Sequence, residues 1–244
     1  ILDAAHNVIA HNQKRSEKKL WTAAGAGSPV QILQVGNERQ EAEALARRIK
    51  TTTDISARGH KDFAVLYRTN AQSRPIEEVF IRWGVPYRIV GGVRFYERKE
   101  VKDILAYLRL IYQPQDTISF ERIVNVPSRA IGSKSLQFFY NFRAKNGYGQ
   151  LKALQQISQS SVVMPKAKVG FANLADIIGS FHQQMNELTP ASLIDALLQR
   201  LDYIHYLTDG TPQGEARVEN IRELLSVAAG YRDTGLDSFL EEVA

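Results

Sequence analysis

The chain has 244 residues, 44% of them hydrophobic, and a formal net charge of +5, with enough apolar material for one large or two small cores. It contains no cysteine, and its five histidines show no metal-ligand spacing, so disulfides and thiolate metal sites are excluded and we expect no metal site. No apolar run reaches the roughly 18 residues of a membrane span, and the N-terminal Ile1-Leu2-Asp3 does not resemble a signal peptide.

The first predicted element is an amphipathic helix over residues 2–12, because apolar side chains recur there at helical spacing. Residues 13–29 are predicted as a basic connector. Its Gly25-Ala26-Gly27-Ser28 run has the glycines of a phosphate-binding loop, but the chain contains no Gly-Lys pair that would place a lysine on a phosphate. We therefore interpret the run as an ordinary loop.

Three segments that follow are predicted as strands, namely 30–35, 63–67 and 85–90. Residues 63–67 form an unbroken apolar run, which is typical of a strand buried on both faces. In 85–90 every second residue is apolar, which is typical of a strand with one buried face. Gly91-Gly92 then permits a tight turn of the backbone.

Two helices are predicted between these strands. Asn37 is expected to cap a helix that runs to about Lys50. Apolar residues at positions i, i+3, i+4 and i+7 predict a second helix over 76–83, which Gly84 ends. A strand–helix–strand order predicts right-handed βαβ units, so we expect an α/β fold with a parallel sheet in this part of the chain.

Polar and basic residues follow the 63–67 run at once. Ligands of parallel sheets bind just past the carboxyl ends of the strands. The cluster includes no carboxylate, and its hydrogen-bond donors suit phosphate and sugar groups. The sequence therefore predicts a binding site formed by Arg68, Thr69, Asn70, Gln72, Ser73 and Arg74.

From about residue 98 onward the apolar spacing is helical throughout, so we expect an all-helical region there. Charge is segregated within it: residues 122–175 carry eight basic residues and no acid, whereas 176–244 carry four basic residues and twelve acids. A solvated surface normally mixes both signs. The acid-free stretch favours a polyanion-binding surface, and a locally biased composition with no partner is the alternative. The apolar stripes predicted to form the core are Val101, Ile104, Leu105 and Leu108; Leu193, Ile194, Leu197 and Leu201; and Val218, Ile221, Leu224 and Leu225.

A turn with glycine followed by a helix start lies inside the acid-free stretch, over residues 127–135. Ser133 is predicted as the N-cap, and the free backbone N–H groups of a helix start suit a phosphate. Arg129 and Lys134 add positive charge to this turn. The alternative is a plain helix–turn–helix packed in a core.

Taken together, these segments resemble the UvrD/PcrA/Rep family of superfamily 1 DNA helicases. The run Leu-Tyr-Arg-Thr-Asn-Ala-Gln-Ser-Arg at 66–74 resembles helicase motif IV, and residues 85–100 resemble the family segment that follows it. Val-Pro-Ser-Arg-Ala-Ile-Gly at 126–132 is similar to the family's Pro-x-Arg-Gly-Ile-Gly turn. The similarity covers essentially the whole chain, with weaker matches in the right order at 103–109, 217–221 and 239–243.

The resemblance implies RecA-like motor domains 1A and 2A with helical insertions 1B and 2B. Residues 1–98 would be a partial RecA-like 2A domain, and residues 99–244 the helical 2B subdomain. The chain would start after motif IIIa and stop before motif V, without Walker A, Walker B or motif VI. It would be an excised piece with no catalytic residue. The intact enzyme would use ATP and Mg²⁺ for 3′-to-5′ unwinding, and the piece alone would bind neither and be inactive.

The resemblance assigns Arg68 and Asn70 to the backbone of single-stranded DNA, where a guanidinium fork and an amide suit phosphate and sugar. The residues alone allow an alternative, in which Arg68 pairs with Glu77 or Glu78 and Asn70 caps the next helix. For the polar residues at 72–74 a cap or surface role is equally expected.

The resemblance assigns Arg129, Gly132, Ser133 and Lys134 to the duplex ahead of the fork. Ala130 stands where the family has its first glycine. Because alanine disfavours positive φ, we expect an altered turn or a weaker contact.

The expected partner is DNA with a single-stranded tail and a duplex junction, in the bacterial cytoplasm beside the nucleoid, during repair or replication. A second hypothesis is a protein-interaction module in which the acidic helices after Asp176 dock repair or replication proteins. A nuclease subunit of the RecBCD/AddAB kind is not favoured, because the sequence shows no cluster of metal-binding carboxylates with a lysine.

Overall fold

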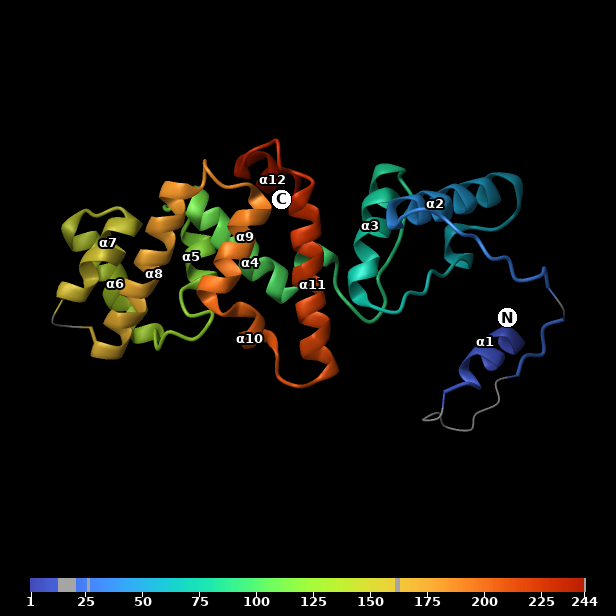
Figure 1. Ribbon diagram of the computed structural model, residues 1–244, viewed down its shortest axis with the longest axis horizontal. Coiled ribbons are helices and arrows are strands. Elements are labelled where there is room, and N and C mark those ends of the chain that lie inside the picture. Colours follow the sequence, from blue (N-terminus) through green and yellow to red (C-terminus); the bar gives the residue numbers. More distant parts are fainter. Residues whose placement is uncertain (13–20, 26, 161–162, 244) are drawn as a thin grey trace.

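A computed structural model describes residues 1–12, 21–25, 27–160 and 163–243. Most of the predicted basic connector therefore lies outside the described residues. No helix among those described is long and apolar enough to cross a membrane. Figure 1 shows the arrangement of the α-helices, which are α1 (Leu2–Ile9), α2 (Glu38–Ile55), α3 (Ser73–Arg82), α4 (Lys99–Tyr112), α5 (Thr117–Ile123), α6 (Ser133–Asn146), α7 (Gln150–Gln156), α8 (Pro165–Gln184), α9 (Pro190–Leu201), α10 (Tyr203–Leu207), α11 (Pro212–Ala229) and α12 (Leu236–Glu242).

The predicted α/β fold with a partial RecA-like parallel sheet is wrong, because the described residues form helices and no strand. The three segments 30–35, 63–67 and 85–90 have no helical structure, and no ladder hydrogen bond joins them to another described segment. A strand exists through hydrogen bonds to a neighbouring strand. An apolar pattern indicates which side chains favour burial and carries no information about that pairing.

The 63–67 segment also differs from its predicted burial. Phe63, Val65 and Tyr67 are half-buried, whereas Ala64 and Leu66 are exposed, Leu66 to 89%. The segment thus packs one face on the small core formed by α2 and α3 and leaves its other face open. The alternation predicted for 85–90 is confirmed in terms of burial. The small core consists of Ala42, Ala46, Ile49, Val79, Phe80 and Val85, with Leu45, Phe63, Val65, Ile76, Trp83 and Tyr87 packed against it.

The predicted helix boundaries near this core hold where a local signal sets them. The Asn37 side chain caps α2 by accepting a hydrogen bond from the backbone N–H of Gln40 at 2.9 Å. The helix continues to Ile55, beyond its predicted end near Lys50. Gly84 follows α3 with φ +65°, a conformation that glycine adopts without strain.

The all-helical region predicted after residue 98 is confirmed by α4 to α12. Its buried residues form one cluster that runs from Phe95 to Val243 and has no residue in common with the small core. All three predicted apolar stripes lie in or against this cluster. In Figure 1, α11 stands between the other helices of this region and α3. The link between α11 and α3 is polar, and the first candidate site lies beside it.

Candidate nucleic-acid interface

The polar residues after the 63–67 segment fold back on themselves as a turn that leads into α3. The side-chain oxygen of Gln72 accepts hydrogen bonds from the backbone N–H groups of Arg68 (2.9 Å) and Thr69 (3.0 Å). Gln72 therefore shapes the turn. The side chains of Arg68 and Asn70 are left exposed, and among the described residues neither has a hydrogen-bond or ion-pair partner.

The two acids that could have neutralised Arg68 are already engaged. The Ser73 hydroxyl donates to Glu77 at 2.6 Å, and Nη1 of Arg74 donates to Glu78 at 2.7 Å. Nε of Arg74 also donates to Glu223 on α11 at 2.5 Å. Arg74 is thus an ion-pair bridge between α3 and α11, whereas Arg68 stays available to a ligand.

A second arginine, Arg98, connects the turn at 68–72, which we call the Asn70 loop, to α11. Its guanidinium donates to the backbone carbonyl of Asn70 (2.9 Å), to the hydroxyl of Ser73 (2.7 Å) and to the side-chain oxygen of Asn220 on α11 (2.8 Å). Asn220 in turn donates to Glu100 at 2.6 Å. Arg98 is only 6% exposed. Burial lowers the pKa of Arg98, while the nearby carboxylates of Glu77 and Glu100 raise it. This buried network couples the Asn70 loop to α11.

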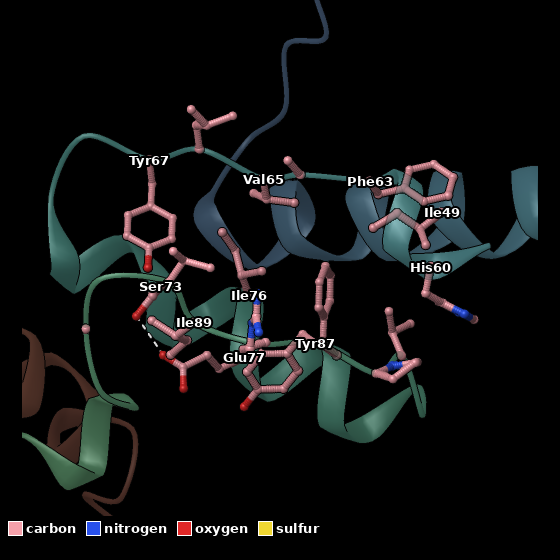
Figure 2. A pocket seen from close by; sticks show the side chains of 18 of the residues that line it. Ile49, His60, Phe63, Val65, Tyr67, Ser73, Ile76, Glu77, Tyr87 and Ile89 are labelled. Carbon is pink, nitrogen blue, oxygen red and sulfur yellow. Dashed lines mark hydrogen bonds between the residues drawn. The ribbon is translucent and has the colours of Figure 1, made fainter. Parts of the chain in front are cut away.

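A cavity of about 890 Å³ lies between the 63–67 and 85–90 segments. Figure 2 shows apolar side chains such as Phe63, Val65 and Ile76 along it, with the Ser73–Glu77 hydrogen bond at one end. Burial raises the pKa of Glu77, and the Ser73 hydrogen bond and Arg98 oppose that shift. The described residues contain no group of acids and histidines suited to a metal ion. The cavity offers apolar contact, and we assign it no catalytic chemistry.

The second predicted site is the turn at 127–132, and here the structure turns Arg129 inward. Its Nη2 donates to the hydroxyl of Tyr107 at 2.5 Å, and burial raises the pKa of Tyr107 to about 12. The side-chain oxygen of Asn125 accepts from the backbone N–H groups of Arg129 (2.7 Å) and Ile131 (3.2 Å). Arg129 therefore holds the turn in place. Its Nη1 donates to the carbonyls of Ile123, Val126 and Pro127.

The turn rests on α8 at Gly170. A Cβ atom at this position would overlap the backbone carbonyl oxygen of Arg129 and would lie 3.2 Å from Cγ1 of Ile131. The absence of a side chain at Gly170 is therefore what lets α8 and the turn approach each other so closely.

The helix start that follows the turn differs by one residue from the prediction. Gly132, and not Ser133, is the N-cap of α6, so no side chain caps the helix. Ser133 and Lys134 are exposed, and the first turn contains no acid. The backbone N–H groups of this first turn point away from the helix without an intrahelical acceptor, next to the positive charge of Lys134.

Ala130 has a φ of +57°, so the turn adopts the left-handed conformation despite its alanine. Such a conformation costs an L-residue about 1–2 kcal/mol. We expect Ala130→Gly to raise the free energy of unfolding by about 1 kcal/mol, because glycine removes this strain. Urea denaturation of both proteins measures the change. A destabilised Ala130→Gly variant would show that the turn relaxes away from positive φ in solution.

The acid-free stretch contains a set of lysines that form no ion pair with a described residue. Of its three arginines, Arg122 binds Asp103 at 2.7 Å, Arg129 binds inside its turn, and Arg143 donates to the Tyr148 carbonyl. Lys152 lies over the Tyr148 ring at 4.8 Å. The stretch therefore presents lysines on α6, α7 and α8, with Lys134, Lys145, Lys152 and Lys166 exposed and Lys168 half-buried.

Sequence reasoning missed three residues that shape these sites, namely Arg98, Asn220 and Gly170. Arg98 and Asn220 are 122 positions apart. Gly170 sits inside a helical pattern, where an isolated glycine weakens the helix and hints at a close approach. Of these three residues, Gly170 alone has a feature in the local sequence that points to its structural role.

Comparison with known proteins adds independent information. A model of the UvrD-like helicase C-terminal domain matches residues 1–243. The ATP-dependent DNA helicase UvrD1 of Mycobacterium tuberculosis (strain ATCC 25618 / H37Rv) is 43% identical over 235 residues, which cover 93% of this chain and 30% of that protein. The ATP-dependent DNA helicase PcrA of Bacillus subtilis (strain 168) is 39% identical over 256 residues, which cover 100% of this chain and 34% of that protein. The chain thus spans about a third of the length of these relatives.

Proposed function

The chain belongs to the UvrD-like helicase family, in the region of its C-terminal domain, and from this membership we propose that it is a DNA-binding portion of a 3′-to-5′ DNA helicase. We propose that residues 1–98 belong to domain 2A and residues 99–244 to domain 2B. ATP and Mg²⁺ would bind to other parts of the intact enzyme. The enzyme would act in the bacterial cytoplasm. The observation that carries the proposal is that two free basic side chains, Arg68 and Lys134, lie beside two turns that internal hydrogen bonds hold in place.

The turn at 68–72 would contact single-stranded DNA. Arg68 and Asn70 extend from a backbone fixed by Gln72 and Arg98, so the turn loses little conformational freedom on binding. A guanidinium without an acid partner binds a phosphate without first breaking an ion pair. Contacts of these two side chains with phosphate and sugar do not distinguish one base from another. We therefore expect binding that depends little on the DNA sequence.

The start of α6 would contact the duplex. The backbone N–H groups next to Gly132 and Ser133 suit one phosphate, and Lys134 supplies a charge beside them. The guanidinium of Arg129 is engaged in at least four hydrogen bonds within the protein. We propose that Arg129 contributes mainly by holding this turn and that Lys134 makes the outward contact.

Reversing the charge of Lys134 tests the duplex contact. We expect Lys134→Glu to weaken binding to a duplex with a 3′ tail roughly tenfold and to lower the salt dependence of the affinity by about one phosphate contact. Fluorescence anisotropy of labelled DNA at several salt concentrations measures both quantities.

Lys145→Glu is the matched control for this experiment. It makes the same charge change at the other end of α6, eleven residues or about 16 Å along the helix. Both positions are exposed, so both variants should fold, and their melting temperatures should differ only by the small effect of charge at the two ends of α6. Equal losses of affinity for the two variants would reduce the duplex contact to a general charge effect.

Docking of repair or replication proteins on the acidic helices after Asp176 stays a second prediction. Several acids there already bind arginines of the same region, among them Asp176 with Arg200 and Asp209 with Arg217. These pairs use a minority of the twelve acids of this stretch, so the DNA-binding proposal depends on the free basic side chains and not on a lack of acidic charge here.

A further inference from the structure

A small cleft lies at the junction between the Asn70 loop and α11. Its volume is about 250 Å³, below the roughly 300 Å³ at which pockets for drug-sized ligands begin. Tyr67 and Asn70 form one side, Val93 lies at a second side, and Gln213 and Arg217 of α11 close it. The cleft adjoins the cavity of Figure 2, which shares its Tyr67, Asn70 and Ile89 walls.

The charges that line the cleft are predominantly positive. Lys99 is exposed and forms no ion pair with a described residue, and Arg217 is held in place by Asp209 at 2.5 Å. The one carboxylate among the described lining residues is Glu100, which is 6% exposed and already accepts from Asn220. An anion that enters therefore meets Lys99, which has no acid partner among the described residues, and Arg217, whose Nη2 is shared with Asp209.

One part of the cleft lining is polar and buried, and another part is apolar. Arg98, Glu100 and Asn220 line the cleft, and they are buried and hydrogen-bonded to one another. Ile89, Val93 and Ala216 supply apolar surface, and the ring of Tyr67 offers a face for stacking. Figure 2 shows this ring projecting from its extended segment toward Ser73. A ligand with a phosphate, polar edges and a flat apolar face fits this combination.

We propose that the cleft is a subsite for one nucleotide of the single strand, next to the nucleotide that Asn70 contacts. Lys99 and Arg217 would bind its phosphate, and its base would lie against Tyr67 and Val93. Asn70 lines both the outer surface and the cleft, so a strand that crosses the loop reaches the cleft without a gap. This proposal rests on the proposed contact of the same loop with single-stranded DNA.

Removing the free ammonium group at the cleft tests the subsite. We expect Lys99→Ala to weaken binding of a labelled oligothymidylate roughly fivefold, because a phosphate contact is lost. Lys102→Ala is the matched control: it lies on the same helix, is exposed and does not line the cleft. Its affinity should stay within about twofold of the unchanged protein. Circular dichroism melts of the full chain establish that both variants are folded.

A photocrosslink provides a readout of position. An oligothymidylate that carries 5-iodouracil should crosslink to the peptide that contains Tyr67, and Lys99→Ala should reduce the yield. Unchanged affinity and unchanged yield in Lys99→Ala, together with weaker binding by Arg68→Ala, would overturn the subsite and leave the single-strand contact standing. If Arg68→Ala and Lys99→Ala both bind as the unchanged protein does, the proposed single-strand contact fails as well.

Discussion

Replacing Arg98 by alanine is expected to lower the free energy of unfolding by about 3–5 kcal/mol, because it removes one member of a buried charged network. The carbonyl of Asn70, the hydroxyl of Ser73 and the side chain of Asn220 would each lose a hydrogen bond to the guanidinium. Ser73 and Asn220 keep their hydrogen bonds to Glu77 and Glu100, so the larger cost arises because these two carboxylates lose a buried cation. Urea denaturation, followed by circular dichroism, measures the change.

The exposed Arg82 provides the control for this measurement. Arg82→Ala removes an arginine from the end of α3 that is exposed to solvent, and its effect should stay within about 0.5 kcal/mol. Arg98→Lys should recover part of the loss, since an ammonium retains the charge but not the fork that reaches several oxygens. A loss below about 1 kcal/mol in Arg98→Ala would mean that water replaces the guanidinium at little cost.

Arg98→Ala should also weaken the binding of single-stranded DNA, because the Asn70 loop loses its connection to α11. Binding is measured below the melting temperature of Arg98→Ala, where the variant is folded. A variant that stays folded and binds single strands as tightly as the unchanged protein would separate the network from the binding loop.

Gly170→Ala is expected to destabilise the chain by about 2–3 kcal/mol through overpacking. The added methyl group would overlap the carbonyl oxygen of Arg129, which is backbone and cannot move aside as a side-chain end can. Either α8 or the turn at 127–132 must shift. Because the turn leads into Gly132 and Lys134, duplex affinity should fall together with stability.

Gly179→Ala is the matched control on the same helix. A Cβ at Gly179 would meet only the side-chain nitrogen of Gln155, at 3.9 Å among the described residues. This substitution should stabilise α8 by about 0.5–1 kcal/mol, because alanine is the better helix former. Thermal and urea denaturation of the two variants should therefore shift in opposite directions. Shifts in the same direction would contradict the close approach at Gly170.

The parts of the fold that sequence predicted correctly are those set by neighbours along the chain. Asn37 caps α2 because its side chain reaches an N–H group three residues on. The stripes that include Ile104, Leu197 and Ile221 are buried because residues three and four apart share a helix face. The strand predictions failed at Leu66, since an apolar run says nothing of a hydrogen-bonded neighbour, and none is present among the described residues.

The binding residues show the same division. Arg68 and Arg129 both stand in polar turns with similar local sequence character, and both were predicted to face DNA. Arg68 is exposed, whereas Arg129 is turned onto Tyr107, 22 positions earlier in the chain. The N-cap was misplaced from Gly132 to Ser133, because serine has the stronger capping propensity and only the backbone geometry decides which residue caps.

The sequence by itself determined the family resemblance, the helical region after residue 98 and the segregation of charge into an acid-free stretch. The tertiary structure decided which basic side chains are free and which are structural. Local pattern acts through contacts within a few residues. The partners of Arg74, Arg98 and Arg129 are supplied in part by distant segments, such as Glu223 at a separation of 149 positions. Such pairs exist only once the helices have packed.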